Sequence, residues 1–459
     1  MKQLNGPKTS SFVQRLQWVL NPVKYMDTAF QSYPDIFSTG VIGGGGLIFV
    51  NTPEGMQELL TRDTKEFEAP GGVNGILRPL LGDQSIILLD GDRHKRERKL
   101  LMPPFHGERM RNYGELILKI TQEATAKWKP GQPFIARNTM QEITLAVILQ
   151  AVFGIYEGSR YDELKKLIAS LLSVTDSPFS SSLLFFHWLQ KDWGAWSPWG
   201  RFLRMRQKID ELLFSEIDER RQNWDESRTD ILNLMMAARD EDGQPMTDEE
   251  LRDELFTLLF AGHETTATAM AWALYWIYRQ PEVHQKLIQE LETLPVDADP
   301  MTIFRLPYLT AVCNEALRIY PVGMLTFPRV TKASMEFMGY ELEAGSVLVG
   351  CIYLLHRQEN LYPEPEQFKP ERFLDRKFSP YEFSPFGGGS RQCIGMALAQ
   401  FEMKLAMAQI IRDYDLELLE KRPVKPARRG VTLSPVGGIK MMMTGKRAAS
   451  KSTPIPAMV

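Results

Sequence analysis

One of the three cysteines, Cys393, lies where a sulfur atom could do chemistry. It belongs to the run Phe386-Gly-Gly-Gly389-Ser-Arg391-Gln-Cys393-Ile-Gly395, directly before a predicted helix. Glycines let the backbone curve tightly around a sulfur and let a flat ligand approach closely. Backbone N–H groups and the helix N-terminus would both favour the thiolate. The alternative, a buried structural cysteine, fits Cys313 and Cys351 better, because they lie in an apolar helix and an apolar strand.

A second chemically suggestive group interrupts a long apolar helix at Ala261-Gly262-His263-Glu264-Thr265-Thr266. Small residues at 261 and 262 would let a planar cofactor lie against the helix. The Thr265 hydroxyl can bond to the carbonyl four residues earlier and loosen the helix there. Glu264 and Thr265 together form an acid–alcohol pair suited to a proton relay. The alternative is a polar kink in a core helix, with His263 a bystander in either case.

Two further pairs of residues share helical faces. Glu315 and Arg318 lie one turn apart, a spacing that usually marks a surface ion pair. His94 and Arg98 are also one turn apart, in a helix that carries the basic run Arg93, Lys95, Arg96 and Lys99.

The elements that position these residues are mainly helical. The capping box Thr247–Glu250 predicts the start of a helix of roughly 33 residues that crosses the whole molecule. Its segment 255–278 is long enough for a membrane span, but His263 and Glu264 favour burial in a soluble core. Helical periodicity predicts further helices at 109–128, 138–153, 160–173, 201–222, 228–239 and 396–412. Strands are predicted at 47–50, 326–330, 335–340 and 347–353, with a hairpin turn at the glycine run 43–46.

Composition excludes several classes of protein. The 459 residues include 54 Lys+Arg against 57 Asp+Glu, so a nucleic acid is not the expected ligand. With 24 Phe, 14 Tyr and 9 Trp the chain is not disordered, and three cysteines cannot form a disulfide framework. No G-x-G-x-x-G or G-x-x-x-x-G-K-[ST] fingerprint is present, which argues against a built-in reductase.

The run Phe386-x-x-Gly389-x-Arg391-x-Cys393-x-Gly395 resembles the haem-binding loop of the cytochrome P450 monooxygenases. The resemblance implies that Cys393 is the thiolate ligand of haem b iron, that Phe386 of the same loop contacts the haem, and that Arg391 reaches a haem propionate. Ala261–Thr266 resembles the oxygen-activation segment, which implies that Ala261 lies against the haem and that Thr265 and Glu264 deliver protons. His94, Arg98 and Arg329 match propionate-binding positions, with His94 where Trp is commoner. Arg372, in Pro370-Glu-Arg372-Phe373, would complete a structural Glu-Arg-Arg core with Glu315 and Arg318.

The implied fold is the cytochrome P450 fold, mainly α with a smaller β-rich region and one long central helix. We expect an N-terminal segment (1–29) with a short amphipathic helix, a single haem-binding domain (30–445) and a disordered tail (446–459). Phe12, Leu16, Val19 and Leu20 share a face of the first helix. Packing onto the body is its simplest role, and peripheral membrane contact is the alternative.

The implied reaction is insertion of one oxygen atom of O₂ into a C–H bond, with electrons from a ferredoxin- or flavodoxin-type donor. That donor could dock on the basic run 93–99. Apolar stretches at 67–89, 175–188, 322–327 and 436–439 predict a large lipophilic small-molecule substrate. The run NEALRIYPVGMLTFPRV resembles a cyanobacterial branch related to animal retinoic acid hydroxylases, which implies a retinoid such as retinoic acid.

Two alternatives stay open at this point. One is a haem-thiolate peroxygenase or hydroperoxide isomerase, and the other is a non-enzymatic helical membrane or scaffold protein. We expect a cytoplasmic monomer without a transmembrane span, with peripheral membrane contact by the first helix left open.

Overall fold

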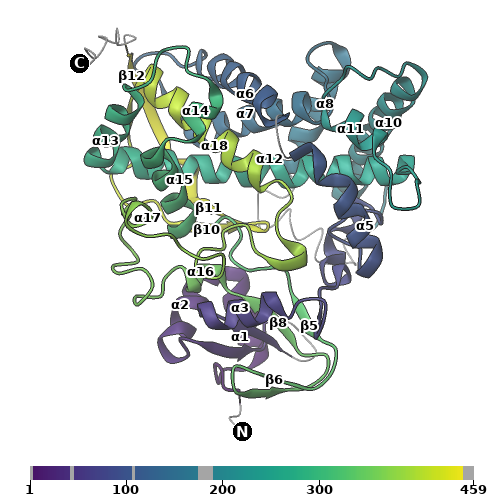
Figure 1. Cartoon of the computed structure of the whole chain (residues 1–459), viewed down its shortest axis with the longest axis vertical. Helices are drawn as coiled ribbons and strands as arrows, with labels where there is room; N and C mark the ends of the chain where they lie inside the picture. The colour runs from purple at the N-terminus through teal and green to yellow at the C-terminus, as the bar shows by residue number, and fades with distance from the viewer. Residues whose placement is uncertain (1–3, 42–45, 106–108, 174–189, 448–459) are drawn as a thin grey trace, which may run out of the picture.

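The computed structural model describes residues 4–41, 46–105, 109–173 and 190–447. Figure 1 shows a long helix, α12 (Asp248–Arg279), that crosses the molecule. The mainly helical architecture with a smaller β-rich region agrees with the fold class predicted from the sequence.

The helices of the described residues vary from single turns to the 32 residues of α12. Besides α12, they are α1 (Ser11–Leu20), α2 (Pro22–Ser32), α3 (Pro53–Thr61), α4 (Arg78–Leu81), α5 (Gly91–Leu101), α6 (Arg109–Thr125), α7 (Ala136–Ala151), α8 (Ser159–Ser173), α10 (Pro198–Gln222), α11 (Ile231–Ala237), α13 (Pro281–Leu291), α14 (Pro300–Phe304), α15 (Pro307–Ile319), α16 (Ile352–Leu355), α17 (Arg372–Asp375) and α18 (Met396–Asp413). Short 3₁₀ turns are η1 (Gly71–Leu77), η2 (Pro103–Phe105), η4 (Gly389–Arg391) and η5 (Val436–Gly438). In Figure 1, α6, α7, α8, α11 and α14 lie on one side of α12, and α1, α2, α3, α16 and the largest sheet lie on the other.

The largest sheet has the strand order β1 (Ile36–Thr39), β2 (Leu47–Val50), β8 (Val347–Gly350), β5 (Arg329–Thr331), β3 (Phe67–Glu68). Its β2–β8 pair is parallel, with Ile48 opposite Leu348, and the other pairs are antiparallel. A three-stranded sheet joins β4 (Pro133–Ile135), β12 (Lys440–Lys446) and β9 (Tyr414–Leu418). Two hairpins complete the described strands: β6 (Met335–Phe337) with β7 (Tyr340–Leu342), and β10 (Pro426–Arg429) with β11 (Thr432–Pro435).

Helix α12 is the buried axis predicted from the sequence. The capping box is formed: Glu250 N donates to Thr247 Oγ1 (3.2 Å), and Thr247 N donates to Glu250 Oε2 (2.8 Å). The helix packs most extensively against α7, and its segment from Leu255 to Ile277 is largely buried. In the described part of the chain, no helix has both the length and the apolar character that a membrane crossing requires. Burial therefore explains the apolar run, and this prediction is confirmed.

Several predicted boundaries were wrong for local reasons. Residues 335–340 form not one strand but β6, a turn and the start of β7, because Met338 and Gly339 take positive φ there. The predicted strand 347–353 ends at Gly350, where α16 follows. Strand β12 continues through Lys446, beyond the expected domain boundary at 445. Residues 42–45, which include all but the last glycine of the run 43–46, and the tail from 448 lie outside the described residues. The strands β1 and β2 that flank the run pair as a hairpin.

The N-terminal helices depart from the expectation in two ways. Residues 22–32 form α2, so the boundary expected at 29–30 falls inside a helix that packs on the sheet through Tyr25 and Met26. The apolar face of α1 does not pack onto the body: Phe12 and Leu20 are both 74% exposed. Gln14 and Trp18 face inward instead. The helix therefore packs onto the body, as its simplest expected role requires, but through Gln14 and Trp18 and not through the predicted apolar face.

Candidate active site

The loop before α18 holds Cys393 in a tightly curved backbone. Cys393 N donates to the carbonyl of Phe386 (3.0 Å), and Gln392 N donates to the carbonyl of Gly389 (3.1 Å). Gly387 and Gly389 both have φ of +66°, a conformation that other residues adopt only with strain. The loop ends where α18 begins at Met396, as the sequence predicts.

The Cys393 side chain is exposed, whereas Cys313 and Cys351 are buried. Protein atoms nevertheless surround the Cys393 sulfur densely enough that burial raises the pKa of its thiol. A thiol that faces a space inside the molecule would be both exposed and surrounded by protein atoms, which explains the two observations. The N–H of Gly395 and the charge of Arg98 lower the pKa but do not outweigh burial. The expectation that the loop alone favours the thiolate is therefore only half right.

Helix α12 contributes Ala261 and Thr265. Ala261 is exposed although Leu259 and His263 on either side are buried, so this stretch of the central helix also borders open space. The Thr265 hydroxyl donates to the carbonyl of Ala261 (2.5 Å), which is the back-bond predicted from the sequence. The helix stays continuous through this point.

Gly262 does not share the role of Ala261. A Cβ built on Gly262 would lie 2.9 Å from Ile148 Cδ1 of α7. Its lack of a side chain therefore allows α7 and α12 to approach closely. The interpretation of Gly262 as part of a flat cofactor surface was wrong.

Glu264 turns towards α7 in this structure. Its carboxylate forms an ion pair with Arg137, accepts a hydrogen bond from Gln141 Nε2 (2.9 Å) and lies 3.5 Å from Thr268 Oγ1. Arg137 and Gln141 were missed by the sequence analysis. Nothing in their spacing marks them, because they meet Glu264 only through the packing of two helices.

His94 lies in a group of cationic side chains. Burial together with the charges of Arg391 and Arg98 lowers the pKa of His94 to about 4, and Arg329 adds to this effect while Asp63 opposes it. The imidazole is therefore neutral near pH 7 and can donate one N–H. Asp63 pairs with Arg329 and Asp90 with Arg391 (3.5 Å), so the charge of Arg98 leaves the group with a surplus of positive charge.

Two of these arginines also hold the Cys393 loop to other elements. Arg98 Nη1 of α5 donates to the carbonyl of Gln392 (2.7 Å). Arg391 donates to the carbonyls of Ala69, Ile86 (2.9 Å) and Leu89 (2.6 Å). Burial lowers the pKa of Arg391 to about 10, which leaves it charged near neutral pH.

Arg329 is fully buried and engaged by protein groups. It donates to both carboxylate oxygens of Asp63 (2.9 and 3.0 Å) and to the carbonyls of Phe327 and Gly388. Asp63 also accepts from Ser390 N (2.6 Å) and thus joins Arg329 to the Cys393 loop. Asp63 is a third residue that sequence reasoning missed, and no motif marks it.

The Glu-Arg-Arg core lies behind the loop. Glu315 accepts from Arg318 Nε (2.6 Å), Arg318 Nη2 (2.8 Å) and Arg372 Nε (3.1 Å), and both Glu315 and Arg318 are fully buried. The predicted contact of these three residues is confirmed, and the alternative of a surface ion pair is excluded.

His356 connects that core with the Cys393 loop. Its Nδ1 lies 3.2 Å from the Arg318 carbonyl, and its Nε2 accepts from Ser384 N (3.1 Å). Burial and Arg318 lower the pKa of His356 to about 3. The ring is therefore neutral, with the proton on Nδ1 where it can donate to that carbonyl.

The basic run on α5 is less basic than its sequence suggests. Arg96 forms ion pairs with Glu97, Asp240 and Glu250, and Lys99 pairs with Glu241. Arg93 and Lys95 are exposed and remain as the outward-facing cations of this run.

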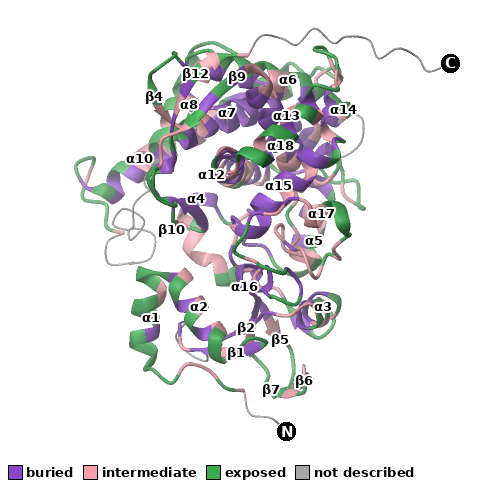
Figure 2. Cartoon of the chain, turned by 90° about the vertical axis from the view of Figure 1, so that its left-hand side faces the viewer, coloured by how far each residue is buried: buried purple, intermediate pink, exposed green. Residues whose placement is uncertain are grey.

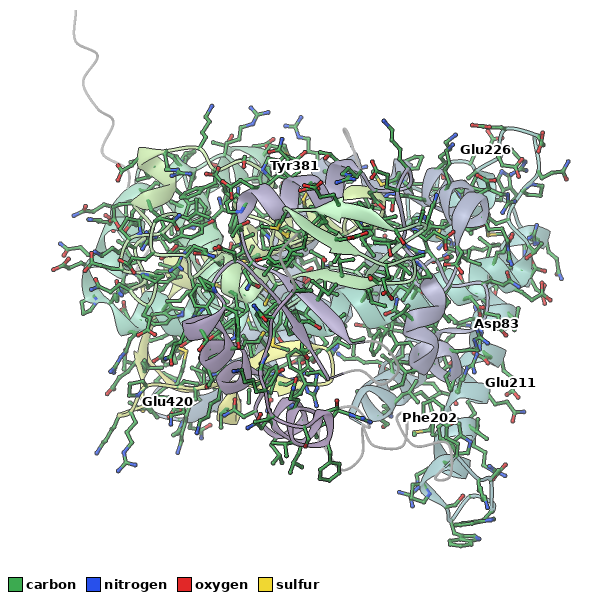
Figure 3. All side chains as sticks on the ribbon, turned by 90° about the horizontal axis from the view of Figure 1, so that it is seen from below. Asp83, Phe202, Glu211, Glu226, Tyr381 and Glu420 are labelled. Atoms are coloured by element: carbon green, nitrogen blue, oxygen red, sulfur yellow. The ribbon has the colours of Figure 1, made fainter. Side chains whose placement is uncertain are left out.

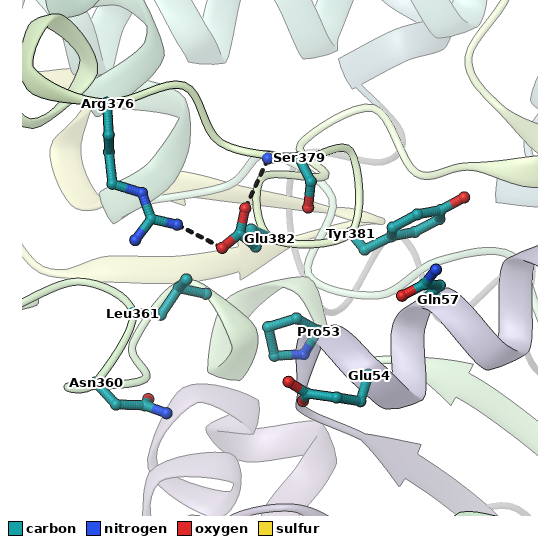
Figure 4. Close-up of a pocket in the computed structure, with 9 residues that line it drawn as sticks. All are labelled: Pro53, Glu54, Gln57, Asn360, Leu361, Arg376, Ser379, Tyr381 and Glu382. Atoms are coloured by element: carbon teal, nitrogen blue, oxygen red, sulfur yellow. Dashed lines mark hydrogen bonds and ion pairs between the residues drawn. The ribbon is translucent and has the colours of Figure 1, made fainter.

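A cavity of about 400 Å³ lies between α3 and the segment 360–382, and Figure 4 shows the residues that line it. Glu382 lies at its wall, paired with Arg376 and accepting from Ser379 N (2.7 Å). None of the residues predicted to bind a cofactor lines this cavity, so it is not the candidate site.

Comparison with known proteins identifies the class of protein. The cytochrome P450 family profile matches residues 4–441. Putative cytochrome P450 135B1 of Mycobacterium tuberculosis is 34% identical over 98% of this chain and 93% of its own length. Putative cytochrome P450 138 of the same species is 32% identical over 96% of this chain and 95% of its own. The chain therefore belongs to the cytochrome P450 family, the haem-thiolate monooxygenases.

Solved structures agree with this assignment. The retinoic acid-bound structure of cyanobacterial CYP120A1 superposes with a TM-score of 0.79 at 26% identity, covering 93% of this chain and 95% of its own. The haem domain of cytochrome P450DA superposes with a TM-score of 0.83 at 25% identity, covering 99% of both chains. Family membership excludes the alternative of a non-enzymatic membrane or scaffold protein.

The residues present fit haem b, the cofactor of this family. The Cys393 thiol is exposed within its loop, and thiolate sulfur is an established haem ligand. A Cβ on Gly387 or Gly395 would meet nothing within 4 Å, so the loop leaves room for a flat group. The surplus positive charge around His94 suits the propionate carboxylates.

Proposed function

We propose that this monooxygenase hydroxylates a large lipophilic substrate, a retinoid such as retinoic acid or a related isoprenoid. The observation that carries the proposal is the likeness to CYP120A1, whose solved structure has retinoic acid bound. The segment 322–327 supports an apolar pocket with Val322 and Met324 buried and Leu325 and Phe327 half-buried. The stretch 175–188, also expected to line the pocket, lies outside the described residues.

Binding and turnover of retinoic acid test the substrate. We expect retinoic acid to shift the Soret band of the holoenzyme and to give a hydroxylated product with a surrogate reductase. An unchanged Soret band and no hydroxylated product would contradict the retinoid substrate, while leaving the monooxygenase class untouched.

We propose that Cys393 ligates the haem iron and that Phe386 of the same loop contacts the haem. Ala261 lies against the haem, and Arg98, His94, Arg391 and Arg329 face its propionates. Bound haem supplies the activation of O₂: one oxygen atom enters the C–H bond and the other leaves as water, with two electrons and two protons from outside. Among these residues, the proposed role of Arg98 has the strongest support, because Arg98 already contacts the Cys393 loop. Arg391 and Arg329 would each exchange a carbonyl or carboxylate partner for a propionate.

Thr265 and Glu264 are the proposed proton-delivering residues. The Thr265 hydroxyl lies beside exposed Ala261, where it can hold a proton next to the bound substrate and O₂. Glu264 directly precedes Thr265 in the sequence. It would exchange protons with solvent once its ion pair with Arg137 is broken.

The position of Glu264 favours one alternative function. Because Glu264 is paired with Arg137 and not turned to Thr265, a peroxygenase or hydroperoxide isomerase, which has little need of the relay, is the second candidate. Thr265→Ala discriminates between the two. In a monooxygenase it should uncouple NAD(P)H consumption from product while peroxide-driven turnover persists, whereas a wild-type enzyme that forms product with peroxide but none with NAD(P)H and a reductase would favour the alternative.

An external electron donor of ferredoxin or flavodoxin type is proposed to dock near α5. Exposed Arg93 and Lys95 support this site, because they lie on the helix that also contacts the Cys393 loop through Arg98.

We further propose that residues 30–445 act as one haem-binding unit in a cytoplasmic monomer. The free state of all three cysteines suits the reducing cytoplasm.

A further inference from the structure

Helix α1 presents an apolar stripe to the outside. Phe12, Leu16 and Leu20 recur every four residues, and their exposed fractions are 74%, 49% and 74%. Val13 (38%) and Val19 (57%) widen the stripe. Soluble helices normally turn such a face inward, so this face is unpartnered in the described chain.

The opposite side of α1 is firmly attached to the molecule. The buried Gln14 donates to the carbonyls of Pro7 (2.9 Å) and Thr9 (2.7 Å), and accepts from Tyr25 Oη (2.9 Å) and Gly40 N (2.8 Å). Trp18 packs on Phe49 with ring centroids 5.8 Å apart. These contacts fix the Gln14 side of α1 against the molecule. The apolar stripe on the opposite side of the helix must therefore face outward.

The charge around the stripe has one sign. The first 26 residues include Lys2, Lys8, Arg15 and Lys24 but no Asp or Glu. The first carboxylate, Asp27, points inward to Tyr353 Oη (3.3 Å). A one-signed basic border around exposed apolar side chains complements a surface that is both apolar and anionic.

A groove of about 450 Å³ lies between the segment 7–9, α1 and α2. Its wall carries two cations, Lys8 and Lys24, and includes no carboxylate. Leu20 of the exposed stripe lies at the same groove, so a cationic recess directly adjoins the apolar face.

The hairpin β10–β11 extends this surface. Arg428 Nη2 donates to the carbonyl of Val19 (3.4 Å), which places the hairpin beside the end of α1. Val431, in the turn between the two strands, is 58% exposed. No Asp or Glu follows Glu420 in the sequence, so this neighbour is also free of carboxylates.

A stacked tryptophan pair lies at the start of α10. Trp193 and Trp196 are 61% and 73% exposed, with ring centroids 6.1 Å apart. Figures 2 and 3 show that this end of α10, marked by Phe202 in Figure 3, lies on the same side of the molecule as α1. Exposed tryptophans are typical of the interface between water and lipid.

We propose that α1 lies in the headgroup layer of an anionic phospholipid bilayer. Phe12, Leu16 and Leu20 contact the acyl chains, and the Lys8–Lys24 groove receives a lipid phosphate. The inference deepens the proposed cytoplasmic location and is independent of the chemistry at the haem.

Two other occupants fit less well. A second copy of this chain would bring two basic borders together, which is repulsive. An acidic protein would match the charge, but its binding would not need the protruding leucines and phenylalanine.

Vesicle sedimentation of the full-length holoenzyme tests the proposal. We expect binding to vesicles of phosphatidylglycerol and phosphatidylcholine, and little binding to phosphatidylcholine alone. The triple variant Phe12→Ser, Leu16→Ser, Leu20→Ser should bind anionic vesicles about tenfold less. Lys8→Gln with Lys24→Gln should also weaken binding and reduce its salt dependence. Val296→Ser, which alters a side chain 61% exposed beyond α13, is the matched control and should bind like wild type.

Each outcome decides the proposal. Failure of the wild-type protein to bind anionic vesicles would overturn the proposal. Unchanged binding by the triple variant would also overturn it, because the binding would then depend on charge attraction alone. A wild-type dimer that becomes monomeric in the triple variant, without vesicle binding, would assign the face to a second copy. Because the changed side chains are exposed, the haem spectrum and melting temperature should not change. Vesicle binding by a protein without a haem-thiolate spectrum would contradict the proposed function but not this inference.

Discussion

Two opposing influences act on the pKa of the Cys393 thiol. Burial raises it, while the Gly395 N–H and Arg98 lower it, and burial dominates. A cation bound to the sulfur would reverse that balance, since thiolate is the form that binds metals. The residue types around Cys393 thus predicted the ligand, but they could not predict how deeply protein atoms surround it.

His356 makes a pH-dependent contribution to stability. Its pKa falls from 6.5 to about 3 on folding, so the unfolded chain takes up a proton between these values and the folded chain does not. Its stabilising contribution is full above about pH 6.5 and is lost as the pH falls, by about 1.4 kcal/mol per pH unit.

The variant His356→Leu tests this contribution. Near pH 7 it should lower the free energy of unfolding by roughly 2–3 kcal/mol, because Ser384 N–H and the Arg318 carbonyl lose their partner. Near pH 5 the gap to wild type should narrow. Urea unfolding at both pH values measures the difference in unfolding free energy between wild type and variant. An equal difference at pH 7 and pH 5 would contradict the account.

Thr265→Ala is the residue-scale test of proton delivery, and the chain offers a neighbour as its control. Thr266 is buried at 4% exposure. We expect Thr266→Val to keep the wild-type ratio of product to NAD(P)H consumed, Thr265→Ser to keep most of it, and Thr265→Ala to lower it about tenfold or more. Equal ratios in the alanine variant and wild type would remove Thr265 from the relay.

At the scale of elements, the α7–α12 contact depends on Gly262. A Cβ there meets Ile148 Cδ1 at 2.9 Å, and the overpacking is partly offset by the helix preference of Ala over Gly, about 1 kcal/mol, so Gly262→Ala should cost no more than about 1–2 kcal/mol net. Adding Ile148→Val should recover part of the loss, because it removes the methyl group in contact. Thermal unfolding of the single and double variants measures this, and strictly additive losses would show that the two residues do not interact.

The Glu315 core is the second element-scale test. Glu315→Gln leaves the fully buried guanidinium of Arg318 and the partly buried one of Arg372 without a carboxylate and should cost about 3–5 kcal/mol. Glu341→Gln, on the exposed face of strand β7, is the control and should cost less than about 0.5 kcal/mol. A Glu315 variant as stable as the control would contradict a structural role.

Sequence pattern predicted the elements better than the contacts between them. Helical periodicity located α7, α12 and α18, because a buried helix needs apolar side chains at regular spacing. It could not show that Glu264 turns to Arg137, or that α1 turns its apolar stripe outward. Both depend on which neighbour offers hydrogen-bond partners, and Gln14 decides the second case.

At the scale of the whole molecule, the length of 459 residues is a poor guide to organisation. Helix α5, helix α12 and the Cys393 loop come from distant parts of the chain, and a single large cofactor would connect them.

A cofactor that binds only the folded state stabilises that state by mass action. Removing haem should therefore lower the melting temperature, and adding haem should restore it in wild type but less fully in Cys393→Ser. Circular dichroism melts measure this, and equal melting temperatures with and without haem would contradict a bridging cofactor.

The most direct test of the central claim is the visible spectrum of the purified, reduced protein under carbon monoxide. Thiolate ligation by Cys393 predicts the red-shifted Soret maximum of a haem-thiolate protein in wild type, and its loss in Cys393→Ser. Bound haem without that maximum, or a variant that keeps it, would show that Cys393 is not the ligand.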